Sequence, residues 1–181
     1  MNRNLAIALC FALAAAPLAA AAASAAAIPA AVAERLKDAA RKAEPKGAEE
    51  KHPVLALDLG ALGPAALALY AREDQSTYSG VVAMAGPAGS GPVRTVALPP
   101  VEEIEGRFEM TPTAVFTTPD AGGRKALVVL YSYYINGSGQ PEDNAGYVYA
   151  WDGRAWRIDE ARTPRLAGVK SAKAARAKLG G

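Results

Sequence analysis

The chain has 181 residues, with 20 Lys or Arg, 18 Asp or Glu, one His and one Cys, and a formal net charge of +2. A charge this close to balance does not favour a dedicated binder of nucleic acid or another polyanion. One histidine and one cysteine exclude the usual zinc sites, so we expect no metal and no cofactor. The high alanine content is typical of proteins from GC-rich bacterial genomes.

The first 27 residues have the features of a secretory signal peptide. Arg3 supplies a positive charge, residues 5–18 form an apolar run, and small residues follow as far as Ala27. This pattern predicts cleavage after Ala23, Ala25 or Ala27 and a periplasmic or secreted protein. An uncleaved anchor is the alternative, but the leucine-rich part is shorter than the roughly 20 apolar residues of a spanning helix. We therefore expect no stable membrane span after cleavage.

Residues 28–53 are predicted to form a helix and a charged linker. Pro29 suits the first turn of a helix. The apolar side chains that follow fall on one thin stripe, which predicts a loosely packed helix: Val32, Leu36, Ala39, Ala40 and Ala43. Residues 44–53 are charged and contain two prolines and a glycine, a composition typical of a linker.

Residues 54–162 are predicted to form a mostly β domain, either an antiparallel sandwich or a barrel-like sheet. Short apolar runs there are separated by Gly, Pro and Asp, with the regular spacing of such folds. Residues 126–131 are apolar on both faces, as in a central strand that is covered on both sides. We expect strands near 54–59, 65–71, 78–85, 93–98, 107–110, 113–117, 126–135, 146–151 and 154–159.

The clearest local signal is Asp152-Gly153 between two β-rich runs, which predicts a two-residue hairpin. Pairing outward from this turn predicts three cross-strand pairs on one face: Trp151 with Arg154, Tyr149 with Trp156, and Tyr147 with Ile158. The aromatic face is defined as Tyr147, Tyr149, Trp151 and Trp156. It is either part of the core or a platform for stacking sugars, and we count it as a candidate binding surface.

A polar loop is predicted beside this face, at residues 136–144. It is rich in oxygen donors, and we take Ser138, Glu142 and Asp143 from it as candidate binding residues. Such a loop either holds calcium at the rim of the sheet or is a solvated hairpin loop.

Residues 163–181 are predicted to form a basic C-terminal tail, with a short helix over 171–179. No acidic residue follows Glu160, whereas six Lys or Arg do. A tail of this kind is either a solvated end or a contact for anionic lipid or cell-wall polymer.

Two segments of the chain resemble each other. Residues 58–70 and 120–131 both run from an aspartate, through a glycine-containing turn, into an apolar strand that ends in tyrosine. This pattern resembles the FG-GAP or VCBS type of extracellular β repeat, and the resemblance implies an extracellular β fold. Family turns often bind calcium through several Asp or Asn side chains, whereas each turn here has a single acidic residue, Asp58 or Asp120.

The second half is also similar to periplasmic inhibitors of invertebrate-type lysozymes. The corresponding pieces are the turn at 120–123, the apolar strand at 126–131, Gly137-Ser138-Gly139, and the aromatic strand at 147–151. In such inhibitors the loop enters the enzyme's cleft, where a hydroxyl group hydrogen-bonds a catalytic carboxylate. The resemblance implies a protein partner.

Catalytic motifs are incomplete. His52 lies in the predicted linker, and neither Gly-Ser-Gly sequence matches the nucleophile elbow of serine hydrolases. Four glutamates cluster after Pro100 and offer a carboxylate pair for glycoside hydrolysis: Glu102, Glu103, Glu105 and Glu109. We expect an exported, non-enzymatic binding protein of the bacterial envelope whose partner is a protein or a glycan. A carboxylate-dependent glycan hydrolase is the alternative.

Overall fold

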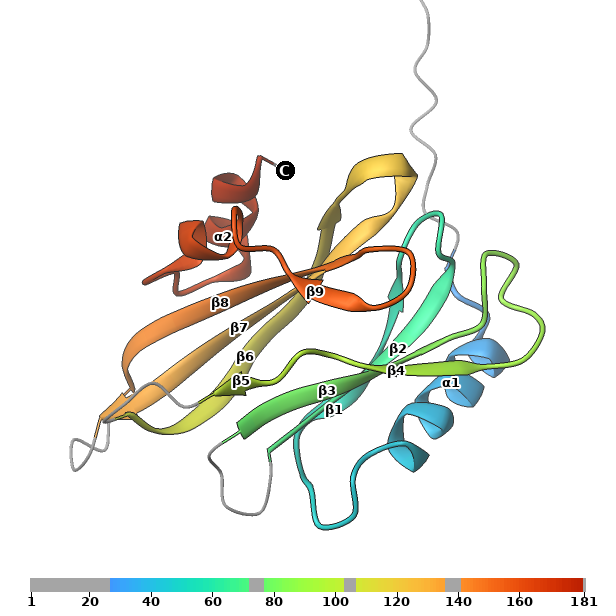
Figure 1. Ribbon diagram of the computed structural model, residues 1–181, viewed down its shortest axis with the longest axis horizontal. Helices are drawn as coiled ribbons and strands as arrows, with labels where there is room; N and C mark the ends of the chain where they lie inside the picture. The colour runs from blue at the N-terminus through green and yellow to red at the C-terminus, as the bar shows by residue number, and fades with distance from the viewer. Residues whose placement is uncertain (1–26, 72–76, 103–106, 136–140, 181) are drawn as a thin grey trace, which may run out of the picture.

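The chain folds into two antiparallel β-sheets that pack face to face, each with a helix on its outer face (Figure 1). The computed structural model describes residues 27–71, 77–102, 107–135 and 141–180, with side chains except at 77, 102, 107–109, 134–135 and 141–142. Residues 1–26 of the predicted signal peptide lie outside the described residues. The predicted mostly β sandwich is confirmed, and the described strands form two separate sheets rather than a barrel.

The first sheet has the strand order β1-β2-β3-β4, and the short β5 also pairs with β3. Its elements, with the preceding helix, are α1 (Ala30–Lys42), β1 (Glu49–Asp58), β2 (Pro64–Ala71), β3 (Thr77–Met84), β4 (Arg94–Ala97) and β5 (Val101–Glu102). β1 begins inside the segment predicted to be linker, because Glu49 and Glu50 pair with the far end of β2. The linker is therefore shorter than the composition indicated.

The second sheet has the order β6-β7-β8-β9. Its elements, with those that follow, are β6 (Arg107–Pro119), η1 (Ala121–Gly123), β7 (Lys125–Ile135), β8 (Pro141–Trp151), β9 (Trp156–Ile158), η2 (Thr163–Leu166) and α2 (Ala172–Leu179). The runs predicted as separate strands at 107–110 and 113–117 are one strand, whose pairing with β7 is irregular near Phe108 and Pro112. The predicted C-terminal helix is confirmed, with Ser171 as its N-cap.

α1 covers the outer face of the first sheet more closely than its thin stripe predicted. Leu36 and Ala40 are completely buried. They pack on the outward alanines of β2 and β3 and on their neighbours: Ala66, Ala68, Ala83, Ala85 and Val54. Because these strand side chains are small, a helix with few large apolar residues still fills the interface. No helix in the described ranges is long and apolar enough to cross a membrane.

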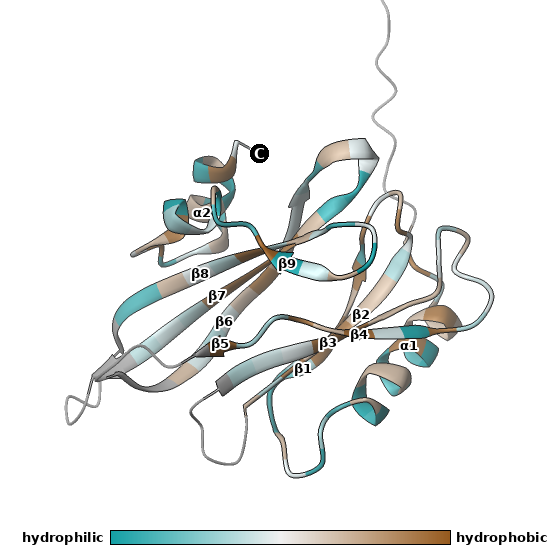
Figure 2. Cartoon of the chain, in the orientation of Figure 1, coloured by the Kyte–Doolittle hydropathy of each residue, from teal (hydrophilic) through white to brown (hydrophobic). Residues whose placement is uncertain are grey.

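The main core lies between the two sheets, where the inward faces of β2, β3, β7 and β8 meet. Figure 2 shows apolar stretches along the strands and more hydrophilic residues on the helices. Tyr149, Trp151 and Trp156 belong to this core. The strand alternation that gathers the aromatic residues on one face turns that face toward the first sheet, so a sugar-stacking platform built from these three rings is wrong.

The hairpin between β8 and β9 differs in register from the prediction. Trp151 pairs with Trp156 and Tyr149 with Ile158, so four residues rather than two form the connection. The Asp152 carboxylate accepts hydrogen bonds from the backbone N–H groups of Arg154 and Ala155, at 2.8 and 2.7 Å. These bonds stabilise the wider loop and hold the pKa of Asp152 at about 2. The shift is two residues, so the rings stay on the predicted face.

The two similar segments occupy equivalent places, since each leads from the first strand of its sheet into the second. Their turns contact each other: the Ala61 N–H donates to the Gly123 carbonyl at 2.9 Å, and the Lys125 N–H donates to the Leu59 carbonyl at 3.0 Å. Gly60, at φ +66°, has no room for a side chain, because a Cβ atom would lie 2.3 Å from the Gly123 oxygen. This contact joins the sheets at one corner.

Candidate functional site

The structure separates the candidate binding residues into three groups. Tyr149, Trp151 and Trp156 are buried. Ser138 lies outside the described residues, and so does the side chain of Glu142. The remaining two, Asp143 and Tyr147, line the same pocket. Part of the predicted site therefore comes together at the end of β8.

This pocket, here called the β8 pocket, lies between β8 and the segment around η2. Its volume is about 270 Å³. Figure 1 shows the segment after β9 running back along β8 toward α2. The described lining residues are Tyr133, Asp143, Asn144, Ala145, Gly146, Tyr147, Thr163, Pro164, Ala167 and Gly168. They combine one carboxylate, one carboxamide, two phenol groups and a threonine hydroxyl group with small residues and backbone.

Asp143 is held by donors on both carboxylate oxygens. It pairs with Tyr133 across β7 and β8. The Tyr133 hydroxyl donates to Oδ2 at 2.6 Å, and the Asn144 backbone N–H donates to Oδ1 at 2.8 Å. Hydrogen bonds to an ionised acceptor are strong and directional, so the carboxylate has a fixed orientation. The sequence placed Asp143 in a loop, whereas it belongs to β8.

The edge of β8 that faces the pocket is only partly covered by the chain that follows it. Val148 donates its N–H to the Thr163 hydroxyl at 3.1 Å and accepts from Asp159 at 2.8 Å. Four residues earlier in β8, the Asn144 carbonyl accepts a hydrogen bond from the Gly168 N–H at 3.0 Å. Because backbone groups alternate along a strand, Gly146 between them also turns its N–H and C=O toward the pocket.

Gly146 is required by the close approach of η2. A Cβ atom there would lie 2.7 Å from the Leu166 Cβ and 2.8 Å from Leu130 Cδ2. Leu166 is completely buried in the outer core of the second sheet. The missing side chain therefore lets η2 pack on β8 and leaves a strip of backbone at the pocket.

Tyr147 gives the pocket an aromatic surface supported from behind. Its ring is half-buried and lies 6.0 Å from the Tyr131 ring, edge to face, and 6.5 Å from the Tyr149 ring. Burial raises the pKa of both Tyr131 and Tyr149, so these supporting phenols stay neutral. The Tyr147 ring is thus backed by two buried, neutral tyrosine rings.

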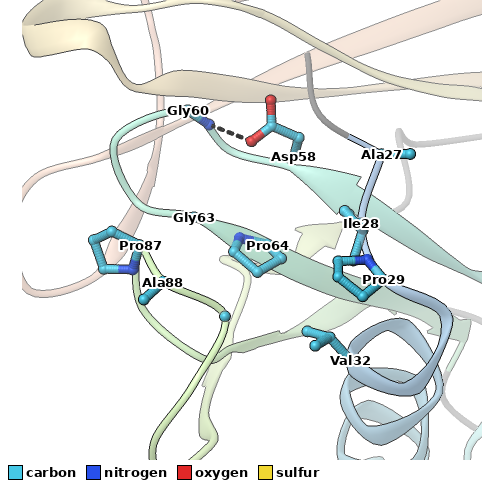
Figure 3. Close-up of a pocket in the computed structure, with 11 residues that line it drawn as sticks. Ala27, Ile28, Pro29, Val32, Asp58, Gly60, Gly63, Pro64, Pro87 and Ala88 are labelled. Atoms are coloured by element: carbon cyan, nitrogen blue, oxygen red, sulfur yellow. Dashed lines mark hydrogen bonds between the residues drawn. The ribbon is translucent and has the colours of Figure 1, made fainter.

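A second pocket of about 260 Å³ lies beside the start of α1 (Figure 3). Its carboxylate, Asp58, accepts a hydrogen bond from the Gly60 N–H at 3.1 Å and forms an ion pair with Lys125. The hydrogen bond from Lys125 lowers the pKa of Asp58. Its other described lining residues are small or apolar, so this pocket offers a ligand fewer polar groups than the β8 pocket.

The catalytic candidates gain no geometric support. His52 lies in β1, with Nδ1 2.9 Å from the Pro53 carbonyl, rather than in a linker. The side chains of Glu102, Glu103, Glu105 and Glu109 lie outside the described residues. Within the described part of the chain, no group of three or more His, Cys, Asp or Glu is arranged to hold a metal ion.

The sequence did not identify Tyr133, Gly146 or Thr163 as site residues. Each becomes visible only once β7, β8 and η2 are placed together, since Tyr133 is ten residues from the carboxylate it binds. Comparison with known proteins adds no further residue: the chain matches no family model, no curated protein and no solved structure.

Proposed function

We propose that this protein is an exported, non-enzymatic binding protein of the bacterial envelope, and that the β8 pocket recognises a glycan. The observation that carries the proposal is the Asp143 carboxylate, fixed by two donors beside the supported ring of Tyr147. The signal-peptide pattern of the first 27 residues supports export.

A sugar matches the chemistry of the pocket. Sugar hydroxyl groups donate to a carboxylate, and the Thr163 hydroxyl and the Gly146 backbone offer further partners. The ring of Tyr147 suits the apolar C–H face of a sugar. At about 270 Å³ the pocket is smaller than the roughly 300–1,000 Å³ of typical small-molecule sites, which favours one ring of a longer chain.

The lining favours binding over hydrolysis. Glycoside hydrolysis uses two carboxyl groups, one on each side of the scissile bond. Among the described lining residues, Asp143 is the one carboxylate. Its carboxylate accepts hydrogen bonds from the Tyr133 hydroxyl and the Asn144 N–H, and the described lining offers no second carboxylate to act with it.

Calorimetric titration of the purified mature protein with soluble fragments of bacterial cell-wall glycan tests this proposal. Asp143→Asn removes a charged acceptor, and Tyr147→Ala removes the stacking surface. Asp143→Asn should weaken binding about ten-fold or more, since a hydrogen bond to a charged group contributes roughly 1.5–3 kcal/mol. Tyr147→Ala should weaken binding by a similar factor, because the sugar loses its aromatic contact. Asp38→Asn, on the exposed side of α1, is the matched control and should leave the affinity unchanged.

Three results would overturn the proposal. One is wild-type affinity in both pocket variants. Another is release of new reducing ends from the glycan, because this would make the protein a hydrolase. The third is loss of lysozyme activity on titration with the protein, without any glycan binding, because this would identify a protein partner.

A further inference from the structure

The C-terminal part of the chain has a charge that the overall balance conceals. Residues 161–181 contain six Lys or Arg and no Asp or Glu, whereas residues 28–160 contain 13 basic and 18 acidic residues. The near-neutral mature chain is therefore a negative body with a strongly positive end. Separated charge of this kind produces a local field that can steer a charged partner.

Five of the six cations are exposed on η2, on α2 and on the segment between them. We call them the cationic face: Arg165, Lys170, Lys173, Arg176 and Lys178. Within the described residues, none of the five forms an ion pair with a carboxylate. The sixth cation, Arg162, bridges Asp120 at 3.1 Å and Asp159 at 2.7 Å, so its charge is already paired with acidic groups.

The cationic face has a rigid support rather than being a loose tail. Ala175 is completely buried on the second sheet, and Ser171 caps α2 by accepting from the Ala174 N–H at 3.2 Å. The Arg176 guanidinium lies 4.3 Å from the centre of the Phe116 ring and donates to the Thr117 carbonyl at 3.0 Å. Lys173 lies one turn before Arg176, so the contacts that hold Arg176 also fix the helical turn that carries Lys173.

We infer that the cationic face binds an acidic polysaccharide of the bacterial envelope. Positive charges that the protein does not itself neutralise are complementary to a polymer that carries regularly spaced carboxylates or phosphates. A membrane surface is the less suitable partner, because a helix that lies in the interface buries an apolar face among the lipids. In α2, Ala172, Ala175 and Leu179 already pack on the second sheet, which leaves only the small side chains of Ala174 and Ala177 as exposed apolar residues. This inference does not depend on the β8 pocket, since the residues are different.

Binding of fluorescently labelled mature protein to polygalacturonate, a carboxylate-bearing polysaccharide, tests the inference. The triple variant Lys170→Gln, Lys173→Gln, Lys178→Gln should bind about ten-fold or more weakly, and wild-type binding should fall steeply from about 0.05 M to about 0.5 M salt. Arg176 is left in place because it supports α2. The matched control removes three exposed cations from the region of α1, Arg41→Gln, Lys42→Gln and Lys46→Gln, and should retain wild-type binding.

Neutral dextran and vesicles of phosphatidylglycerol and phosphatidylcholine complete the experiment. The inference predicts no binding to dextran and weaker binding to vesicles than to polygalacturonate. It is overturned by equal binding to dextran, by equal losses in the two triple variants, or by absence of polygalacturonate binding at low salt. Tighter binding to the vesicles, lost in the first triple variant, would replace the polysaccharide with a lipid surface.

Discussion

The two sheets of this protein have the same layout but different covers. Each is an antiparallel meander whose second strand follows a turn that begins with aspartate. The first is covered by the 13-residue α1, which buries Leu36 and Ala40 on a field of alanines. The second is covered by the four-residue η2 and the eight-residue α2. This shorter cover leaves part of the β8 edge beside a pocket.

The difference shows how a sheet layer acquires a candidate site. Where the cover is long and the strand residues are small, Leu36 and Ala40 fill the interface, and the pocket beside the start of α1 is lined mainly by small and apolar residues. Where the cover is short, a glycine, a carboxylate and a phenol ring meet at the gap, as Gly146, Asp143 and Tyr147 do. We therefore expect the α1 side to contribute mainly to stability, and we propose the η2 side for recognition; mutations can separate the two.

The largest expected effect comes from truncating the central leucine of each cover. Leu36→Ala and Leu166→Ala should each lower the free energy of unfolding by about 2–5 kcal/mol, since both side chains are completely buried. Urea unfolding measures this. Under conditions where both variants remain folded, Leu166→Ala should also weaken glycan binding, because Leu166 positions η2 over β8. Unchanged glycan affinity in Leu166→Ala, or a loss in Leu36→Ala, would contradict the division of roles.

A smaller effect is expected when a methyl group is added at the edge of β8. Gly146→Ala places a Cβ atom against Leu166 and Leu130, and such overpacking costs about 1–3 kcal/mol. In a double-mutant cycle, Gly146→Ala with Leu166→Ala should cost less than the sum of the single changes, because Leu166→Ala keeps the Leu166 Cβ atom but removes Cδ1, which lies 2.9 Å from the position of the added methyl group. Urea unfolding of the four proteins measures the coupling. Additive losses would show that the outer atoms of the Leu166 side chain do not press on the added methyl group.

Much of the fold could be predicted from the sequence because the signals are local. Alternating apolar runs placed the strands, and Asp152-Gly153 placed the last hairpin. The register of that hairpin was wrong by two residues, because the Asp152 side chain binds two backbone N–H groups and widens the loop. The charge of Glu49 and Glu50 predicts a linker, but both residues belong to the edge strand β1. Charged side chains are compatible with an edge strand, because they can reach water there.

The candidate site was less predictable, because it depends on contacts between distant elements. Which side of the aromatic face meets the first sheet cannot be decided within one hairpin, and Tyr149, Trp151 and Trp156 proved to be core. Asp143 was identified for its oxygen atoms, but its partner Tyr133 follows only from the register of β7 and β8. Thr163 comes from a segment that the sequence marked only as basic tail.

The smallest effect is expected at the corner that both sheets share. Asp58→Asn removes the ion pair with Lys125, a partly exposed pair that contributes at most about 1 kcal/mol. The pair lowers the pKa of Asp58 from its ordinary value of 3.8, so its contribution is present above about pH 4 and is lost as the pH falls through the folded-state pKa.

Thermal unfolding of wild type and Asp58→Asn between about pH 7 and pH 2 should therefore show a difference that shrinks toward acid pH. Asp38→Asn, in an exposed pair on α1, is the control and should show a smaller difference at neutral pH. A difference for Asp58→Asn that grows as the pH falls would contradict the assigned ion pair.

The most direct test of the recognition site is amide chemical-shift mapping by NMR as cell-wall glycan fragments are added to the mature protein. The account predicts that the largest shifts cluster at Asn144, Gly146 and Gly168, whose backbone groups lie at the β8 pocket. Largest shifts at Gly60, Gly63 and Gly89, around the second pocket, would contradict it. The absence of any amide shift along β8 at a high glycan concentration would also contradict it.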